Sequence, residues 1–253
     1  MVSQNFGGDD ERRATQVVAA SLVAAVLLSV PLAAVYVVAA APLVELVGGG
    51  ADATRLGAAY LVIVAPGLVF EGINLVASRT YAGVGDTVTP MAVRAAGAAL
   101  NVALSVGLVF GADMGVRGAA VGTTTATGAV TLVFAWGLTG RSYGGRGASP
   151  LPVGVGVRPP AELLGQLFRV SAPLVARRIA QGVVVFPLLA VAAFFGEVVL
   201  AAIGVARQVR QLLNSFTWGF SVAASTLVGQ ALGAAAEADA VAYGREIVNL
   251  SLV

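Results

Sequence analysis

Long stretches without a charged residue limit what this chain can fold into more than any other feature. No charge occurs between Arg13 and Glu45, and runs with few or no charges recur along the rest of the chain. A helix of about 20 apolar residues crosses the hydrocarbon core of a bilayer. We therefore predict the start of a seventh span near residue 240 and six complete spans, over residues 14–44, 56–78, 95–112, 118–137, 167–195 and 198–225.

The composition indicates that lipid is the main solvent. Of the 253 residues, 58% are hydrophobic and 11% are charged, and the mean hydropathy is +0.89. These values leave too few polar residues for a water-facing surface. The sequence has no cysteine and no histidine, which excludes disulfides, thiolate chemistry, the usual zinc and haem ligands, and a histidine-based catalytic triad.

The basic residues give no sign of a nucleotide or nucleic-acid partner. All 15 are arginines, so the lysine of a P-loop is missing, and no GxGxxG motif occurs. A net charge of +2, dispersed among hydrophobic runs, does not form a nucleic-acid-binding surface. We expect a chain that is not an enzyme, that has no cofactor, and that has the lipid bilayer as its main partner.

The distribution of arginines predicts the orientation in the membrane. One set of alternate connections holds only Arg55 and Arg117, whereas the opposite set holds seven arginines. Positively charged short loops stay in the cytoplasm. We therefore expect a plasma-membrane protein with residues 1–13, 79–94 and 141–166 on the cytoplasmic side. These segments hold the seven arginines Arg12, Arg13, Arg79, Arg94, Arg141, Arg146 and Arg158.

A segment rich in glycine and proline divides the chain. Residues 141–166 are typical of a linker between two helical lobes. We expect an N-terminal lobe over residues 1–140 and the start of a C-terminal lobe over residues 167–253. The alternative is a disordered segment between two unrelated membrane pieces.

The sequence also contains an internal repeat with an offset of 226 residues. Ser3-Gln4-Asn5-Phe6-Gly7-Gly8 matches Gly229-Gln230-Ala231-Leu232-Gly233-Ala234, and each copy continues into acidic residues. Six predicted spans separate the copies, and an even number returns the chain to the same face. This predicts an all-α fold of two parallel six-helix bundles. The second copy stands at the end of a predicted span, whereas no span precedes the first copy in this sequence. We therefore expect an interior piece of a protein of about twelve spans, holding half to two-thirds of both bundles.

Taken together, four stretches resemble the multidrug and toxic compound extrusion (MATE) family of cation-coupled antiporters. The resemblance implies a piece from the end of the family's second helix to the start of its ninth. The stretches are the paired Gln-x-x-Gly ends, Gly83-Val84-Gly85-Asp86-Thr87-Val88-Thr89-Pro90, Gly115-Val116-Arg117-Gly118-Ala119-Ala120, and Gly219-Phe220-Ser221-Val222-Ala223-Ala224-Ser225-Thr226-Leu227-Val228-Gly229-Gln230.

Polar residues at helical spacing form a stripe on most predicted spans. Such residues cannot face lipid cheaply, so they point into the bundle or into a watery cavity. Alternatives remain, because threonines can bond back to their own helix and Arg177 and Arg178 can extend toward the cytoplasmic boundary. Our candidates for lining a substrate cavity are Asn74, Arg177, Arg207, Gln211, Asn214 and Trp218.

Glu71 is the only acidic residue well inside a predicted span. A buried carboxylate without a partner would have a raised proton affinity, as a proton-coupling site requires. The alternative is a salt bridge to an arginine such as Arg94. We list Glu71 among the candidates for cation coupling.

The MATE resemblance implies further coupling residues. Many prokaryotic members carry an Asn-x-x-x-Asp pair on the fifth helix and a threonine on the sixth, and Asn101 and Thr123 match two of these. Ser105 stands where the aspartate would be, and Gln181 stands where some members carry a glutamate. Serine cannot exchange a proton near neutral pH, although its neutral oxygen can ligate Na⁺.

These observations predict a secondary active exporter of multiple drugs or organic cations. The resemblance implies that an inward H⁺ or Na⁺ gradient drives export of small amphipathic or cationic compounds by alternating access. One alternative is a flippase for lipid-linked precursors, whose larger headgroup would favour a strongly cationic groove such as Arg177, Arg178, Arg207 and Arg210 could form. Another is a non-transporting membrane remnant.

Overall fold

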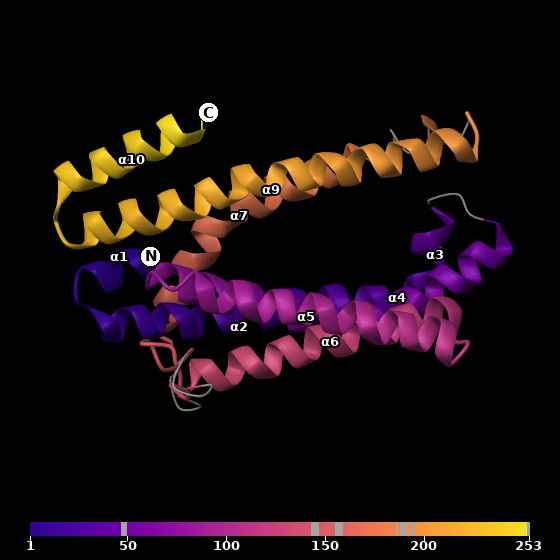
Figure 1. Ribbon diagram of the computed structural model, residues 1–253, viewed down its shortest axis with the longest axis horizontal. Coiled ribbons are helices and arrows are strands. Elements are labelled where there is room, and N and C mark those ends of the chain that lie inside the picture. The colour runs from indigo at the N-terminus through magenta and orange to yellow at the C-terminus, as the bar shows by residue number, and fades with distance from the viewer. Residues whose placement is uncertain are drawn as a thin grey trace.

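The computed structural model describes residues 1–46, 50–142, 147–154, 159–185, 187, 191–192 and 195–251. Arg146, Arg158 and the side chain of Arg178, which entered the sequence analysis, lie outside this description. The described residues form helices and no strand, which confirms the all-α fold (Figure 1). The helices are α1 (Val2–Gly7), α2 (Glu11–Val38), α3 (Ala40–Glu45), α4 (Ala51–Gly83), α5 (Val88–Val106) with a π-helical extension η1 (Gly107–Gly111), α6 (Gly115–Leu138), α7 (Ala161–Val183), α9 (Glu197–Gly233) and α10 (Glu237–Ser251).

Four of the described helices are long and apolar enough to cross a membrane, and they match the first four predicted spans. They cover Glu11–Val38, Ala51–Gly83, Val88–Gly111 and Gly115–Leu138. Helices of 23 and 37 residues, α7 and α9, fall on the fifth and sixth predicted spans, whose passage through the membrane stays a prediction. Helix α10 begins where the seventh span was expected.

Two predicted boundaries are wrong. The first span breaks after Val38, and α3 continues it as a separate short helix. Pro42 explains the break, because a proline ring inside a helix clashes with the carbonyl four residues earlier, here that of Val38. Helix α7 begins at Ala161, so the last six residues assigned to the linker are helical.

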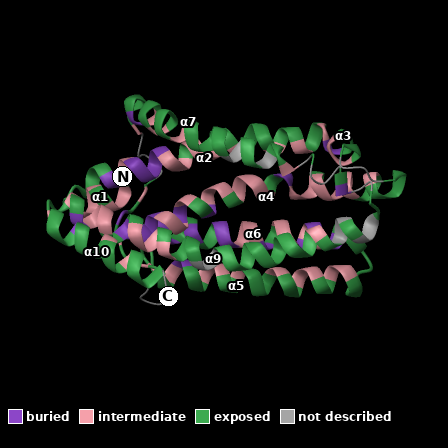
Figure 2. Cartoon of the chain, turned by 90° about the horizontal axis from the view of Figure 1, so that it is seen from above, coloured by how far each residue is buried: buried purple, intermediate pink, exposed green. Residues whose placement is uncertain are grey.

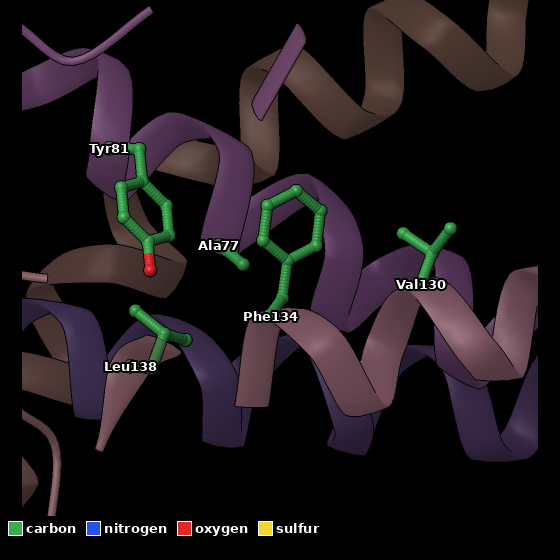
Figure 3. Close-up of a cluster of buried hydrophobic side chains, with 5 residues drawn as sticks. All are labelled: Ala77, Tyr81, Val130, Phe134 and Leu138. Atoms are coloured by element: carbon green, nitrogen blue, oxygen red, sulfur yellow. The ribbon is translucent and has the colours of Figure 1, made fainter. Parts of the chain in front are cut away.

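Helices α2, α4, α5 and α6 form one bundle, with its core between α4 and α6 (Figure 3). Ala77 and Tyr81 of α4 pack against Val130, Phe134 and Leu138 of α6. The rings of Tyr81 and Phe134 lie 6.0 Å apart, centroid to centroid. Burial is concentrated at one end of the bundle (Figure 2).

We call this the linker end, because residues 147–153 pack against it. Ser149 N–H donates to Gly137 O at 3.0 Å, and Val153 N–H donates to Leu138 O at 2.7 Å. The Leu151 side chain is fully buried against Ala14 and Val18. Residues 147–153 of the linker are therefore packed against the N-terminal bundle and do not form a disordered segment between two unrelated pieces.

The two copies of the repeat cross each other at the linker end. A Cβ atom on Gly7 would overlap Gln230 O, and a Cβ atom on Gly233 would overlap Gln4 O. The offset of 226 residues relates these two contacts, so each copy makes the contact that the other makes. Reciprocal contacts of this kind are what a two-fold axis produces, and they support the predicted parallel repeat.

The turn after each copy repeats as well. Asp9 and Ala235, which correspond at the same offset, have left-handed φ angles of 56° and 57°. Asp10 N–H donates to Asn5 O, and Ala236 N–H donates to Ala231 O, both at 2.9 Å. Weakly similar sequences thus fold into the same helix, turn and helix.

The lobes diverge away from the linker end. Helices α9 and α10 form the upper layer in Figure 1 and the α2/α4/α5/α6 bundle forms the lower one. Residues 17–20 of α2 pack against the first turns of α7, and α1 packs against the last turns of α9. Most described side chains of α7 and α9 farther along are exposed (Figure 2).

Candidate functional site

An ion pair joins Glu71 of α4 to Arg94 of α5. The two terminal nitrogens of Arg94 lie 3.0 and 3.1 Å from Glu71 Oε1, and Arg94 Nε donates to Ser78 Oγ at 3.0 Å. The side chains are about half exposed, at 40% for Arg94 and 53% for Glu71. Of the two interpretations of Glu71, the salt bridge to Arg94 is confirmed and the carboxylate without a partner is wrong.

Asn101, Ser105 and Thr123 lie together between α5 and α6. Ser105 Oγ donates to Asn101 Oδ1 at 3.0 Å, and Thr123 Oγ1 lies 3.3 Å from the same oxygen. Close helix approach allows this, because Gly122 packs directly against the Ser105 backbone. The cluster presents neutral oxygens without a carboxylate, a set that suits Na⁺ ligation better than proton exchange.

Asn74 lies inside the bundle beside these groups. It is 1% exposed, its Nδ2 donates to Thr127 O at 3.2 Å, and its buried Oδ1 accepts no hydrogen bond from the residues that the structure describes. It borders a cavity of about 190 Å³ together with Glu71, Arg94 and Asn101. The structure thus groups Asn74 with the coupling candidates, although we expected it in the substrate cavity.

The threonines of α6 bond mainly to their own helix. Thr123, Thr127 and Thr131 donate to the carbonyls of Ala119, Thr123 and Thr127 at 2.8–3.0 Å. This confirms the structural interpretation of the stripe for Thr127 and Thr131. Thr123 alone also faces a predicted partner, Asn101.

A larger cleft of about 930 Å³ separates α7 from α9. It brings together Arg177 and Gln181 of α7 with Arg207 and Asn214 of α9, four of the predicted residues. Arg210, which we did not choose as a cavity candidate, also borders it. Apolar residues form the remaining walls, namely Ala180, Val184, Val185, Ile203 and Ala206.

Trp218 lies between the lobes rather than in this cleft. The guanidinium carbon of Arg79, on α4, stands 4.2 Å from the centroid of the Trp218 ring, in cation–π geometry. Nearer the linker end, Gln230 Nε2 donates to Gly83 O at 2.9 Å. Gln211 is exposed on α9 and does not border the cleft.

Sequence reasoning missed Arg79 as a site residue because its partner lies on a helix 139 positions away. Arg210, named above only for the flippase alternative, could have been chosen as a cavity residue from the sequence. It follows Arg207 by three residues and precedes Asn214 by four, which places all three on one helical face.

The MatE family model matches residues 1–106 and 173–253, most of the chain. The chain belongs to the MATE family. Among curated proteins it is similar to the probable multidrug resistance protein YoeA of Bacillus subtilis, with 25% identity over 92% of this chain and 51% of the relative. It is also similar to the multidrug export protein MepA of Staphylococcus saprophyticus, with 24% identity over 83% of this chain and 46% of the relative. The chain thus spans about half the length of these MATE relatives.

Solved structures support the fold. A MOP superfamily transporter from Pyrococcus furiosus, described by the reverse polarity of its binding pocket, has a TM-score of 0.85 at 22% identity. It is matched over 98% of this chain and 54% of that one. A MATE transporter in an outward-facing conformation has a TM-score of 0.82 at 21% identity, over 98% and 55% of the two chains.

Proposed function

We propose that the full-length protein exports small amphipathic or cationic compounds in exchange for H⁺ or Na⁺. MATE membership supports the exporter, and the observation that carries the exchange is the separation of two polar sites in two lobes. One is the small cavity of the bundle, beside Glu71 and Asn101, and the other is the cleft between α7 and α9. No cofactor enters this proposal.

Alternating access would arise from rocking of the lobes. The described lobes join at the linker end and diverge beyond it, and one similar structure is outward-facing. If the linker end is cytoplasmic, as the arginine distribution predicts, this arrangement opens to the outside. Opening to the cytoplasm then requires that Arg79 leave Trp218 and that Gln230 release Gly83.

The small cavity of the bundle is our candidate for ion coupling. Asn74 Oδ1 is a buried acceptor without a partner in the described part of the chain, and Asn101, Ser105 and Thr123 contribute neutral oxygens nearby. Gln181, the candidate at the second coupling position, lies on α7 of the other lobe and borders the cleft there. An ion that favours one state of the lobes and a substrate that favours the other would exchange through this equilibrium.

Export can be tested in cells that carry the full reading frame. We expect them to extrude a fluorescent amphipathic cation, and we expect extrusion to stop when the gradient of one coupling ion is collapsed. A proton ionophore and a sodium ionophore, applied separately, distinguish H⁺ from Na⁺. Export that survives the loss of both gradients contradicts the proposal.

Glu71 can be tested separately from the neutral cluster. We expect Glu71→Gln to change the pH dependence of transport, with Glu45→Gln, outside the four apolar helices, as the matched control. Unchanged transport and unchanged pH dependence in Glu71→Gln would remove Glu71 from the coupling mechanism and leave the Asn101 cluster.

A flippase for lipid-linked precursors is the second candidate. The arginines between α7 and α9 support it, since an anionic headgroup needs cationic partners. The reverse pocket polarity described for the Pyrococcus furiosus transporter indicates that pocket charge varies among similar folds. Accumulation of a lipid precursor in a deletion strain, without export of any amphipathic cation, would favour this candidate.

A further inference from the structure

We propose that the cleft between α7 and α9 binds the anionic head of an amphiphile through Arg177, Arg207 and Arg210. The inference rests on the proposed transport function and narrows its substrates, because among small amphipathic compounds it selects those with an anionic head rather than the cationic ones. A phosphate or carboxylate would lie among the guanidinium groups, and an apolar tail would lie along the aliphatic wall.

The first argument is charge. Between Glu162 and Glu237 the sequence contains five arginines and one acidic residue, Glu197. Glu197 is the first residue of α9, about 15 Å of helix from Arg207. Within the described part of the chain, ion pairs join only Asp52 to Arg55 and Glu71 to Arg94. The three arginines of the cleft thus have no carboxylate partner among the described residues.

The second argument is depth. Arg177 lies 16 residues into α7, or about 24 Å from its start, and Arg207 lies 10 residues into α9. Both positions are far from the helix ends at the linker end, where an arginine could reach the cytoplasmic water. An unpaired arginine at membrane depth is costly, and such residues mark ligand or ion pathways.

The third argument is geometry. Arg207 and Arg210 are one helical turn apart on α9 and face Arg177 across the cleft. Arginine presents a planar fork of donors that matches phosphate and carboxylate oxygens in pairs. Val184, Val185 and Ile203 border the same space without a polar atom on their side chains. A charged subsite beside an aliphatic wall fits an amphiphile better than it fits a free inorganic anion.

The test measures binding to the purified full-length protein in nanodiscs of phosphatidylcholine, which has no net charge. The probe is dodecyl phosphate, compared with dodecyltrimethylammonium, dodecyl maltoside and inorganic phosphate. We expect dodecyl phosphate to bind at least about tenfold more tightly than each comparator. If inorganic phosphate binds as tightly as dodecyl phosphate, the claim that the ligand needs an apolar tail is wrong. If dodecyl maltoside binds as tightly, the claim that the ligand needs an anionic head is wrong.

Matched variants assign the binding to the cleft. Arg207→Gln and Arg177→Gln should each raise the Kd for dodecyl phosphate about tenfold or more. Arg169→Gln is the control, because it removes the same charge from α7 but does not border the cleft, and it should change the Kd less than about twofold. Arg207→Lys, which keeps the charge and loses the fork, should give an intermediate Kd and keeps the test usable if Arg207→Gln fails to fold.

Equal effects of Arg207→Gln, Arg177→Gln and Arg169→Gln would overturn the proposal. They would mean that acidic residues elsewhere in the full-length protein neutralise the arginines, or that the head binds at another place. Gradient-driven export is measured separately, on the same purified protein reconstituted into phosphatidylcholine liposomes that can hold an ion gradient. Export that persists without dodecyl phosphate binding removes only this inference, whereas binding without export removes the exchange mechanism and leaves the site.

Discussion

In the α2/α4/α5/α6 bundle Arg94 pairs with a carboxylate, whereas the arginines between α7 and α9 meet no carboxylate among the described residues. Arg94 is held by Glu71 and Ser78, while Arg207 borders an open cleft. Both arginines lie well inside long helices. A polar residue in a membrane helix is therefore not evidence of a ligand site until its partners are known. The Glu71 partner accounts for Arg94 without a ligand, whereas the arginines of the cleft are the basis of our ligand proposal.

The largest expected change in unfolding free energy tests whether the α2/α4/α5/α6 bundle has a packed hydrophobic core. Phe134 is fully buried between α4 and α6, so Phe134→Ala should lower the free energy of unfolding by about 3–5 kcal/mol. Phe110→Ala is the control, since Phe110 is 80% exposed. Chemical unfolding in detergent micelles measures both. Equal losses would contradict a core centred on Phe134.

The crossing that joins the two lobes should be the next most sensitive place. Gly233→Leu would force side-chain atoms into the Gln4 backbone, and we expect a loss of about 1–3 kcal/mol or more. Gly219→Leu, on the same helix with open space around it, should leave the stability unchanged. A tolerated Gly233→Leu would mean that the lobes do not cross here.

Two asparagines allow the lobes to be compared directly. Asn74→Ala removes a buried hydrogen bond to Thr127 O and leaves a cavity, so it should cost about 1–2 kcal/mol. Asn214→Ala, in the exposed cleft, should cost nothing measurable. Similar losses in thermal unfolding would show that the cleft is as tightly packed as the bundle.

The smallest expected effects differ in sign. Arg94→Leu should destabilise the protein by about 1 kcal/mol or less, since the Glu71 pair that it breaks is half exposed. Arg207→Leu should raise the stability slightly, because it removes a charge that has no carboxylate partner among the described residues from a helix that we predict to cross the membrane. The same sign for both variants in chemical unfolding would remove the contrast between the two lobes.

The sequence predicts much of this fold because its signals are local or periodic. Uncharged runs predict the bundle helices, and the repeat at residues 3–8 and 229–234 predicts the parallel arrangement of the two lobes. Pro42 also indicates the break after Val38, but the long uncharged run around it led us to predict one continuous span. The start of α7 was missed because hydropathy begins to rise only after Glu162.

The site was less predictable, because helical periodicity shows which residues share a face and not what that face meets. Asn74 and Arg207 both belong to polar stripes, yet one is enclosed by the bundle and the other opens to a cleft. The Arg79–Trp218 contact joins two lobes and has no signal in either helix alone.

Interlobe distances test the central claim of two rocking lobes most directly. The sequence of this stretch has no cysteine, so introduced cysteines can carry spin labels at chosen positions. One pair, Val38 and Phe195, lies away from the linker end, and the other, Met91 and Leu232, lies near it, all four being exposed. When the exported compound is added to the full-length protein in nanodiscs, we predict that the first distance shortens while the second lengthens. Two distances that stay constant, or that change in the same direction, would contradict the account.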